Sequence, residues 1–567
     1  MFSLRYLLVF PLFFSLSITT WALNLRVDFR WHDQPLSLPS PPLVTPAGET
    51  FILTRLDFLL NEPRLTLASG RTITASQWHS YLHGEDLQIL HLSNLPEEPI
   101  TKLNLHLGPS QTINEGDPNQ YPARHALNPL HNGLHWDPQS GYIFLALEGQ
   151  LPEEELAFAY HYGNSANRVT LEFEQEIDPK GFYQLTLHLD RLFPAPFKIA
   201  DQTSTHSRPD DPLVPHFKEA LSKAFSLSRI TTPPNATKQA ETSESDLVGT
   251  PYPFRLPKNF PHPHLPTDYP LTKERVRLGR ALFQETALSQ NSATSCASCH
   301  PSQSAFADPA TKSFGFLGEK TKRHSMPLLN LAWKTTPFFW DGRAGTLREQ
   351  ILEPIEDPLE MGEKLPQVIT KLEKISYYPR LFQQAFGDPE ITSERLAIAI
   401  EQFLLALTSF NSKFDQATKG KVELSEQEKK GFELFMTEND PRLGLRGADC
   451  FHCHSGAFFT NHRFHNNGLP PADDDLGQEH ATKRASDRLK FSTPSLRNVA
   501  VTSPYMHDGR FDTLEEVVSF YSEGIHRSPT LDPNIAKHPG KGLNLNEEEQ
   551  AALVAFLKTL SDPKFSD

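Results

Sequence analysis

Two short stretches decide the fold of the C-terminal half: Cys296-Ala-Ser-Cys299-His300 and Cys450-Phe-His-Cys453-His454. Each has the spacing C-x-x-C-H, which attaches a c-type haem, because two thiols bond to the vinyl groups of one porphyrin and the adjacent His ligates the iron. The two motifs use all four Cys of the chain. A disulfide in each motif, or a single zinc site, is the alternative. Two complete motifs with no Cys left over favour two covalently attached haems.

An internal repeat surrounds these motifs. A shift of 167 residues aligns residues 327–354 with residues 494–521, and ten of the 28 aligned positions are identical. We therefore expect a duplicated cytochrome c fold. In this alignment Pro354 lies opposite Tyr521. A Tyr oxygen can ligate iron and a Pro side chain cannot, so we expect Tyr521 to close one haem and Pro354 to leave the other open. The alternative for Tyr521 is an ordinary core or surface aromatic.

Length and composition restrict the class of protein. The chain has 567 residues, which at roughly 150 residues per domain predicts two to four domains. Hydrophobic residues make up 38% of it, enough for packed cores, and its formal net charge is −15. The sequence has no block of Lys and Arg that would follow a phosphate backbone, so nucleic acid is not an expected partner.

The N-terminus predicts export. Arg5 precedes an apolar run over residues 6–18, and Thr20-Trp21-Ala22 offers small residues at the −3 and −1 positions of a cleavage site. We predict a signal peptide over residues 1–22 and a periplasmic mature protein. The run is too short to cross a bilayer and no later stretch reaches the ~18 apolar residues needed, so no membrane span is expected.

Sequence periodicity divides the mature chain. Residues 23–200 contain several segments that alternate apolar and polar residues, which predicts an all-β domain closed as a sandwich or barrel. Residues 201–270 read as a Pro-rich linker with one short helix. Helical periodicity then predicts a mainly α C-terminal half, with one cytochrome c-like haem domain over residues 271–430 and a second over 431–567.

An open haem beside a closed one suits reaction with hydrogen peroxide. Cleavage of the O–O bond needs a group that takes a proton from one oxygen and delivers it to the other. Glu360 lies six residues after Pro354, and Gln350 lies one helical turn before it. Both can reach the open face, although many Glu side chains on such segments are merely solvated.

Residues 270–560 resemble the bacterial di-haem cytochrome c peroxidase superfamily. The sequence motifs that carry the likeness include Phe338-Phe-Trp-Asp-Gly-Arg343, Pro358-Leu-Glu-Met-Gly362 and Thr493-Pro-Ser-Leu-Arg-Asn498. Ordinary members have Met where Tyr521 stands, so the chain looks like the MauG and MbnH branch, whose members oxidise aromatic side chains of another protein. The resemblance implies that Glu360 is the acid/base, that Gln350 and Pro354 line the peroxide site, and that Trp340 relays charge between the haems. Trp340 could otherwise be plain core packing.

The sequence departs from that branch at two places. Gly447-Ala448-Asp449 stands where MauG has a surface Trp just before the second haem motif. A calcium ion between the haem domains is usual in the family, but His324 stands where an Asn often helps, and Ser492 and Pro494 offer only carbonyls. We expect a calcium ion and different exit routes for charge.

The N-terminal half resembles MbnP-like periplasmic copper-binding proteins. The likeness rests mainly on His125-Ala-Leu-Asn-Pro-Leu-His131-Asn-Gly-Leu-His135-Trp136 and on the following Gly141–Gly149. Proteins of that group can carry a Trp oxidised to kynurenine beside a His-bound copper, and MbnH-type enzymes install this oxidation. Imidazoles are good copper ligands, so His125, His131 and His135 are candidate ligands and Trp136 is the candidate modified residue. A polar loop packed on Trp136 is the alternative, and Trp78 and Trp31 are rival candidates.

Three functions remain open at this point. The first is a di-haem peroxidase or oxygenase that uses peroxide to oxidise a Trp of its own N-terminal domain or of a partner's. The second is a detoxifying peroxidase that takes electrons from a small cytochrome or cupredoxin, which a Met in place of Tyr521 would have favoured. The third is a copper-binding or electron-transfer protein whose haems only relay electrons, which Pro354 disfavours.

Overall fold

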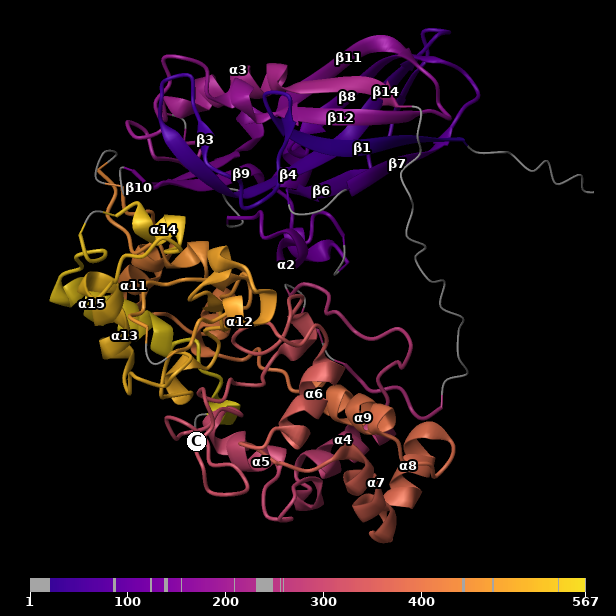
Figure 1. The fold of residues 1–567 in the computed structure, drawn as a ribbon, viewed down its shortest axis with the longest axis vertical. Coiled ribbons are helices and arrows are strands. Elements are labelled where there is room, and N and C mark those ends of the chain that lie inside the picture. Colours follow the sequence, from indigo (N-terminus) through magenta and orange to yellow (C-terminus); the bar gives the residue numbers. More distant parts are fainter. Residues whose placement is uncertain are drawn as a thin grey trace, which may run out of the picture.

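The computed structural model describes residues 21–84, 88–122, 125–136, 141–153, 156–208, 210–230, 248–254, 256–257, 260–440, 444–471, 474–538 and 540–565. The predicted signal peptide lies outside the described residues, apart from residues 21 and 22. The chain forms a β domain followed by a helical half (Figure 1).

The N-terminal domain consists of two sheets. One has the order β14-β12-β1-β2 with β7 also paired to β1, and the other has the order β11-β8-β4-β9-β10-β13 with β3, β5 and β6 also paired to β4. The strands are β1 (Trp21–Trp31), β2 (Gln34–Pro35), β3 (Leu43–Val44), β4 (Thr50–Leu67), β5 (Thr72–Thr74), β6 (His79–His83), β7 (Gln88–Leu95), β8 (Ile100–Leu107), β9 (Ile143–Leu151), β10 (Leu156–Gly163), β11 (Val169–Ile177), β12 (Phe182–His188), β13 (Ser204–Thr205) and β14 (Phe225–Ile230). Short helices α1 (Gln111–Asn114) and α2 (Pro129–Asn132) interrupt the chain between β8 and β9.

Alternating side chains close the two sheets on one core. In β1, Leu23, Leu25 and Val27 are buried while the residues between them are partly exposed, as expected for a strand with one face toward a core. Strands β9 and β10 are buried along almost their whole length, because β10 also faces the helical half. The predicted all-β class of this domain is confirmed.

The N-terminal domain continues beyond residue 200, where the sequence predicted the linker to begin. Helix α3 (Leu213–Ala224) buries Phe217 and Leu221 in the core of the β domain. Strand β14 then pairs antiparallel with β12, from Phe225 opposite Leu187 to Ile230 opposite Phe182. The short helix that the sequence predicted in this region is α3, and it belongs to the β domain instead of a linker. The edge strand β14 was missed, because a short strand depends on its neighbours for stability. Residues 231–247 of the predicted linker lie outside the described residues.

The C-terminal half is helical, as predicted. Its first part holds α4 (Lys273–Phe283), α5 (Cys296–Cys299), α6 (Leu347–Glu356), α7 (Leu365–Lys374), α8 (Tyr378–Phe386) and α9 (Ser393–Leu405). Its second part holds α10 (Lys413–Thr418), α11 (Glu426–Met436), α12 (Glu479–Thr482), α13 (Leu514–Glu523), α14 (Pro533–Ala536) and α15 (Glu547–Lys558), with the short hairpin β15 (Phe464–His465) and β16 (Phe491–Ser492). Among the described residues, no helix is both long and apolar enough to cross a membrane.

The structure repeats itself at the spacing that the sequence repeat indicates. Thr346 caps α6 and Thr513 caps α13, each in a reciprocal pair with the Glu three residues later. Isolated bridges join Phe338 to Ala344 and Tyr505 to Phe511, which are the same two positions 167 residues apart. The two parts of the helical half are therefore built on one plan.

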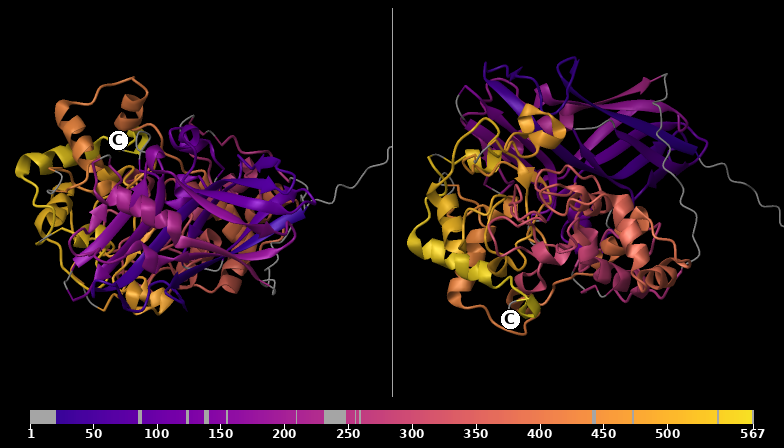
Figure 2. Two further views of the ribbon diagram at one scale, coloured as in Figure 1. Left: turned by 90° about the horizontal axis from the view of Figure 1, so that it is seen from above. Right: turned by 60° about the horizontal axis from the view of Figure 1, so that its bottom comes forward.

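The β domain lies across the second haem domain (Figure 1; Figure 2, right). Helix α14 packs against β10, and the Gln150 side chain donates a hydrogen bond to the Leu531 carbonyl. Arg463 reaches from the haem half to Asp57 at 2.9 Å and to the Tyr81 hydroxyl at 3.1 Å. The interface therefore combines apolar packing with buried charge.

Helix packing in both haem domains requires a glycine. A Cβ on Gly431 of α11 would lie 1.9 Å from the Ala552 carbonyl of α15, and one on Gly279 of α4 would lie 1.8 Å from the Ala399 carbonyl of α9. We expect Gly431→Ala to destabilise the protein by about 1–3 kcal/mol, because the helices must separate. Thermal unfolding followed by circular dichroism measures this. Gly345→Ala is the control, since its Cβ would meet only the end of the Glu349 side chain; equal losses in both variants would contradict the packing argument.

Candidate functional site

The first haem motif opens into a cavity of about 740 Å³. Cys296, Cys299 and His300 line it. The predicted peroxide-site residues Gln350, Pro354 and Glu360 line the same cavity, and so does Trp340, the predicted charge relay. Gln350 and Pro354 lie one turn apart on α6 and so face the same side. The structure thus brings together residues that the sequence grouped only by spacing and resemblance.

Glu360 has the environment of a proton-transfer group. The pKa of its carboxyl is raised to about 7, mainly by burial and also by the nearby Asp357, while Arg343 opposes the shift. A carboxyl with a pKa near neutrality can both accept and release a proton at physiological pH, which is what acid/base catalysis requires.

The second haem motif opens into a separate cavity of about 220 Å³. Cys450, Cys453 and His454 line it, and Tyr521 of α13 lines it too. Asn467 donates a hydrogen bond from Nδ2 to the Tyr521 hydroxyl oxygen at 3.0 Å. Tyr521 and Pro354 are each seven residues after the first residue of their helix, so the sequence alignment of these two positions matches their placement.

Both proximal histidines are prepared as ligands. His300 donates from Nδ1 to the Phe306 carbonyl at 2.9 Å, and His454 donates from Nδ1 to the Phe459 carbonyl at 3.0 Å. A carbonyl only accepts, so the proton is on Nδ1 and the Nε2 lone pair is available for iron. The four thiols form no disulfide. The donor set and the cavities fit two c-type haems and leave no role for the disulfide or zinc alternatives.

Trp340 lines both cavities and is 8% exposed. Its Nε1 donates to the His324 carbonyl at 2.8 Å, and its own carbonyl accepts from the Ser492 amide at 2.8 Å. These bonds hold the indole between the two haem sites, where the resemblance places a charge relay.

The region predicted to hold calcium contains a buried ammonium group. Lys334 Nζ lies 3.1 Å from Ser492 Oγ, and burial lowers its pKa to about 8. His324 Nδ1 donates to the Ala310 carbonyl at 3.2 Å. The positive charge of Lys334 next to Ser492 repels a calcium ion at the same place. Calcium binding therefore stays a prediction.

The three histidines predicted to bind copper do not converge. His125 stacks on Tyr121 with ring centroids 4.6 Å apart, and His135 packs edge-on against Tyr142. His131 is exposed, with its ring against Tyr81. The loop and helix α2 that carry them turn each ring toward a different Tyr, so the described residues form no metal-binding group from this trio. The structure differs here from the sequence-based hypothesis.

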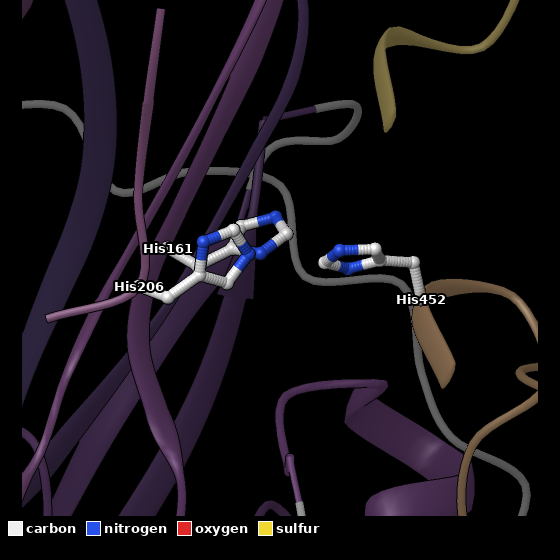
Figure 3. Close-up of side chains that lie close together, drawn as sticks. All are labelled: His161, His206 and His452. Carbon is white, nitrogen blue, oxygen red and sulfur yellow. The ribbon is translucent and has the colours of Figure 1, made fainter. Parts of the chain in front are cut away.

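A different histidine cluster lies beside Trp136, at the domain interface. His161 comes from β10, His206 follows β13, and His452 stands inside the second haem motif, where the sequence reading assigned it no role (Figure 3). Ring centroids are 5.0 Å apart for His161 and His206 and 5.1 Å for His206 and His452. The Trp136 ring lies 6.3 Å from that of His206.

The rival tryptophans occupy other surroundings. Trp31 packs in the core of the β domain against Phe51 and Phe193. Trp78 is partly exposed and donates from Nε1 to the His91 carbonyl. Trp136 is buried, and its Nε1 has no hydrogen-bond partner among the described residues.

Comparisons with known proteins agree with this architecture. A family model described as Di-haem cytochrome c peroxidase matches residues 273–423, and one described as MbnP matches residues 20–207. The methylamine utilization protein MauG of Methylorubrum extorquens is 37% identical over 329 residues, which are 57% of this chain and 88% of that protein. The chain belongs to the di-haem cytochrome c peroxidase family. It is a MauG-like member fused to an MbnP domain, and therefore an oxidoreductase that acts on peroxide with two c-type haems.

Two further proteins are similar to this chain. Cytochrome c551 peroxidase of Nitrosomonas europaea is 30% identical over 298 residues, which cover 52% of this chain and 81% of that protein. A solved structure, of a MauG-like protein associated with microbial copper homeostasis, is 34% identical with a TM-score of 0.49, covering 56% of this chain and 99% of that one.

Glu360 gives a prediction on rate and pH. We expect Glu360→Gln to slow the reaction with peroxide by about 100- to 10,000-fold at unchanged haem content, as is typical of losing a general acid/base. In this predicted role Glu360 accepts a proton in the first step and acts when ionised, so we expect the wild-type rate to rise as pH rises through about 7. Stopped-flow absorbance measures both effects. Glu356→Gln, an exposed carboxyl at the end of α6 and four residues before Glu360, is the control; an unchanged rate in Glu360→Gln removes this residue from the mechanism.

The Pro354 and Tyr521 asymmetry gives a spectroscopic prediction. We expect the ferric protein to show one high-spin and one low-spin EPR signal, because of the two equivalent helix positions only Tyr521 offers an oxygen that can ligate iron. Tyr521→Phe should remove the low-spin signal. Tyr505→Phe should retain it, since the Tyr505 hydroxyl lines the same cavity but donates to the Val499 carbonyl. Two low-spin signals in the wild type would contradict an open first haem.

Proposed function

We propose that this chain is a periplasmic enzyme that uses hydrogen peroxide to oxidise Trp136 of its own MbnP domain and thereby matures a metal site. One observation carries the proposal: Trp136 packs one ring away from His452, through His206, and His452 lies between the two haem-binding thiols Cys450 and Cys453. Enzyme and substrate are thus in contact within one chain.

The residues of the first site divide the work on peroxide. The bound haem pair supplies peroxide activation and holds the oxidising equivalents. Glu360 takes a proton from the incoming peroxide and returns it to the departing oxygen as water forms. Pro354 leaves the distal side without a protein ligand, and Gln350 can orient the peroxide from the same helical face. Burial excludes water and strengthens these interactions.

Electrons from Trp136 reach the haem sites through a series of aromatic rings. Trp340 borders both haem cavities and so bridges the first site to the second. From the second site the path continues over His452 and His206 to Trp136. Conversion of Trp to N-formylkynurenine removes four electrons and four protons from the indole and two water molecules, and these waters supply the two oxygen atoms. Two peroxide molecules accept the four electrons and four protons and leave as four waters, so the net reaction consumes two peroxides and releases two waters; hydrolysis then releases formate and leaves kynurenine.

Docking of the MbnP domain supports oxidation in cis. The interface buries Arg463 against Asp57 and packs α14 on β10, so Trp136 is held beside the second haem motif rather than meeting it by diffusion. An intramolecular substrate has a high effective concentration, which favours self-modification over reaction with a partner protein.

Peptide mapping after peroxide treatment tests this function. We expect the peptide carrying Trp136 to gain one oxygen atom and lose one carbon, as kynurenine requires, while the Trp31 and Trp78 peptides stay unmodified. Glu360→Gln should yield no product, and Trp136→Phe should consume peroxide without that product. Absence of any oxidised Trp, together with rapid oxidation of a reduced small cytochrome or cupredoxin, would establish the detoxifying peroxidase instead.

A further inference from the structure

A lysine lies beside the residues where the sequence predicted a calcium ion. Lys334 lines the first haem cavity, and its Nζ donates to Ser492 Oγ at 3.1 Å and to Thr336 Oγ1 at 3.2 Å. Ser492 lines the second cavity. We infer that the Lys334 ammonium binds a propionate of the first haem and takes the place of the predicted calcium ion. The inference does not depend on oxidation of Trp136.

The chain fixes the position of Lys334. This residue directly follows a 3₁₀ turn over Leu331–Trp333. Trp333 is fully buried, and its Nε1 donates to the Pro261 carbonyl at 2.6 Å. The Lys334 side chain as a whole is only partly exposed, and its ammonium group is buried. The charge is therefore held at the wall of the cavity and does not extend into bulk water.

No acidic side chain balances this charge. Within the described part of the chain, no carboxylate forms an ion pair with Lys334. The neighbouring His462 interacts electrostatically with Lys334 and His264, and its own Nε2 is buried without a hydrogen-bond partner among the described residues. The hydroxyls of Ser492 and Thr336 accept from the ammonium but carry no charge. A buried cation without a counter-ion is costly, so this place favours an anion.

The cofactor brings such an anion. A haem carries two propionate groups, and the haem attached by the first motif has to fill the cavity that Lys334 lines. A hydrogen bond between an ammonium and a carboxylate is stronger than one between neutral groups. Arg323 also lines this cavity, but it already pairs with Asp341 at 2.8 Å and with Asp475 at 2.7 Å. Lys334 is thus the buried cation that still needs a partner.

The same place does not suit calcium. Calcium takes about six to eight oxygen ligands, commonly carboxylates. Of the residues predicted to surround it, His324 offers nitrogen, and its Nδ1 already donates to the Ala310 carbonyl at 3.2 Å. Ser492 Oγ already accepts from Lys334. The ammonium also repels a second cation, so the residues present fit an internal cation and not a metal ion.

The position of Lys334 has a consequence for the redox chemistry. Ser492 joins it to the predicted charge relay, because the Ser492 amide donates to the Trp340 carbonyl at 2.8 Å. A fixed positive charge beside a haem favours the ferrous form over the ferric form, which carries one more positive charge. We therefore expect Lys334 to raise the reduction potential of the first haem.

Chelation of the full-length, haem-loaded protein tests the calcium part of the inference. After dialysis against EGTA, we expect elemental analysis to find no stoichiometric calcium. The EPR and absorption spectra of both ferric haems should stay unchanged, and added Ca²⁺ should not alter them. One equivalent of calcium whose removal changes either spectrum would overturn the inference.

Matched variants test the propionate part. Lys334→Met removes the charge, so we expect a lower reduction potential of the first haem in spectroelectrochemistry and a shifted propionate band in the resonance Raman spectrum. Lys334→Arg should keep both near their wild-type values, because a guanidinium also binds a carboxylate. Lys322→Met is the control, since Lys322 lines the same cavity but is exposed, and water and salt screen its charge. Lys334→Met with an unchanged potential and propionate band would contradict the inference.

Haem content, measured as the pyridine haemochrome, shows whether Lys334→Met still assembles. If it does not, Lys334→Gln takes its place with the same expected shifts, because Gln keeps a hydrogen-bond donor but no charge. These measurements use no peroxide, so their outcome is independent of the proposed oxidation of Trp136.

Discussion

Everything in the helical half depends on holding a flat prosthetic group by two thiols and one imidazole whose orientation is fixed. The hydrogen bond from Nδ1 of His300 to the Phe306 carbonyl, and its counterpart from His454 to Phe459, set the tautomer and direct Nε2 into each cavity. Helices α6 and α13 begin with the same capping arrangement, and a glycine allows two helices to pack closely in each haem domain. The same frame is therefore used twice.

On a duplicated frame, single side chains decide the difference between the two sites. Pro354 and Tyr521 occupy equivalent helical positions, but only the Tyr offers an oxygen. The first cavity is larger than the second and holds a carboxyl, Glu360, whose pKa is raised by burial. Asymmetry thus arises from a few substitutions, while backbone and proximal ligands stay alike, and Trp340 connects the two sites.

The domain interface buries several charged groups. Lys537, Glu438 and Asp449 are buried together, and the buried Asp57 pairs with Arg463, whose side chain is 28% exposed. Buried ion pairs add little net stability, because desolvation offsets much of the attraction, but they penalise any misaligned docking in which one partner is left unpaired. Such an interface favours a single placement of the MbnP domain, and that placement brings His161, His206 and Trp136 to His452.

Sequence alone determined the parts of this protein whose signals are local. Residue spacing alone reveals the two C-x-x-C-H motifs, the 167-residue repeat and the alternation in β1. The structure places Gln350, Pro354, Glu360 and Trp340 around one cavity, as their resemblance to family motifs implied.

What only the tertiary structure decided are contacts between residues far apart in the chain. A short helix was predicted at α3, but its place in the core of the β domain, and strand β14 beside it, could not be read from the Pro-rich tract because both depend on tertiary packing. The histidines of the loop near Trp136 were grouped by closeness in sequence, yet the chain turns each toward a different Tyr. His161, His206 and His452 are separated by up to 291 residues, and no local pattern marks them, because their proximity exists only when the β domain is docked on the second haem domain.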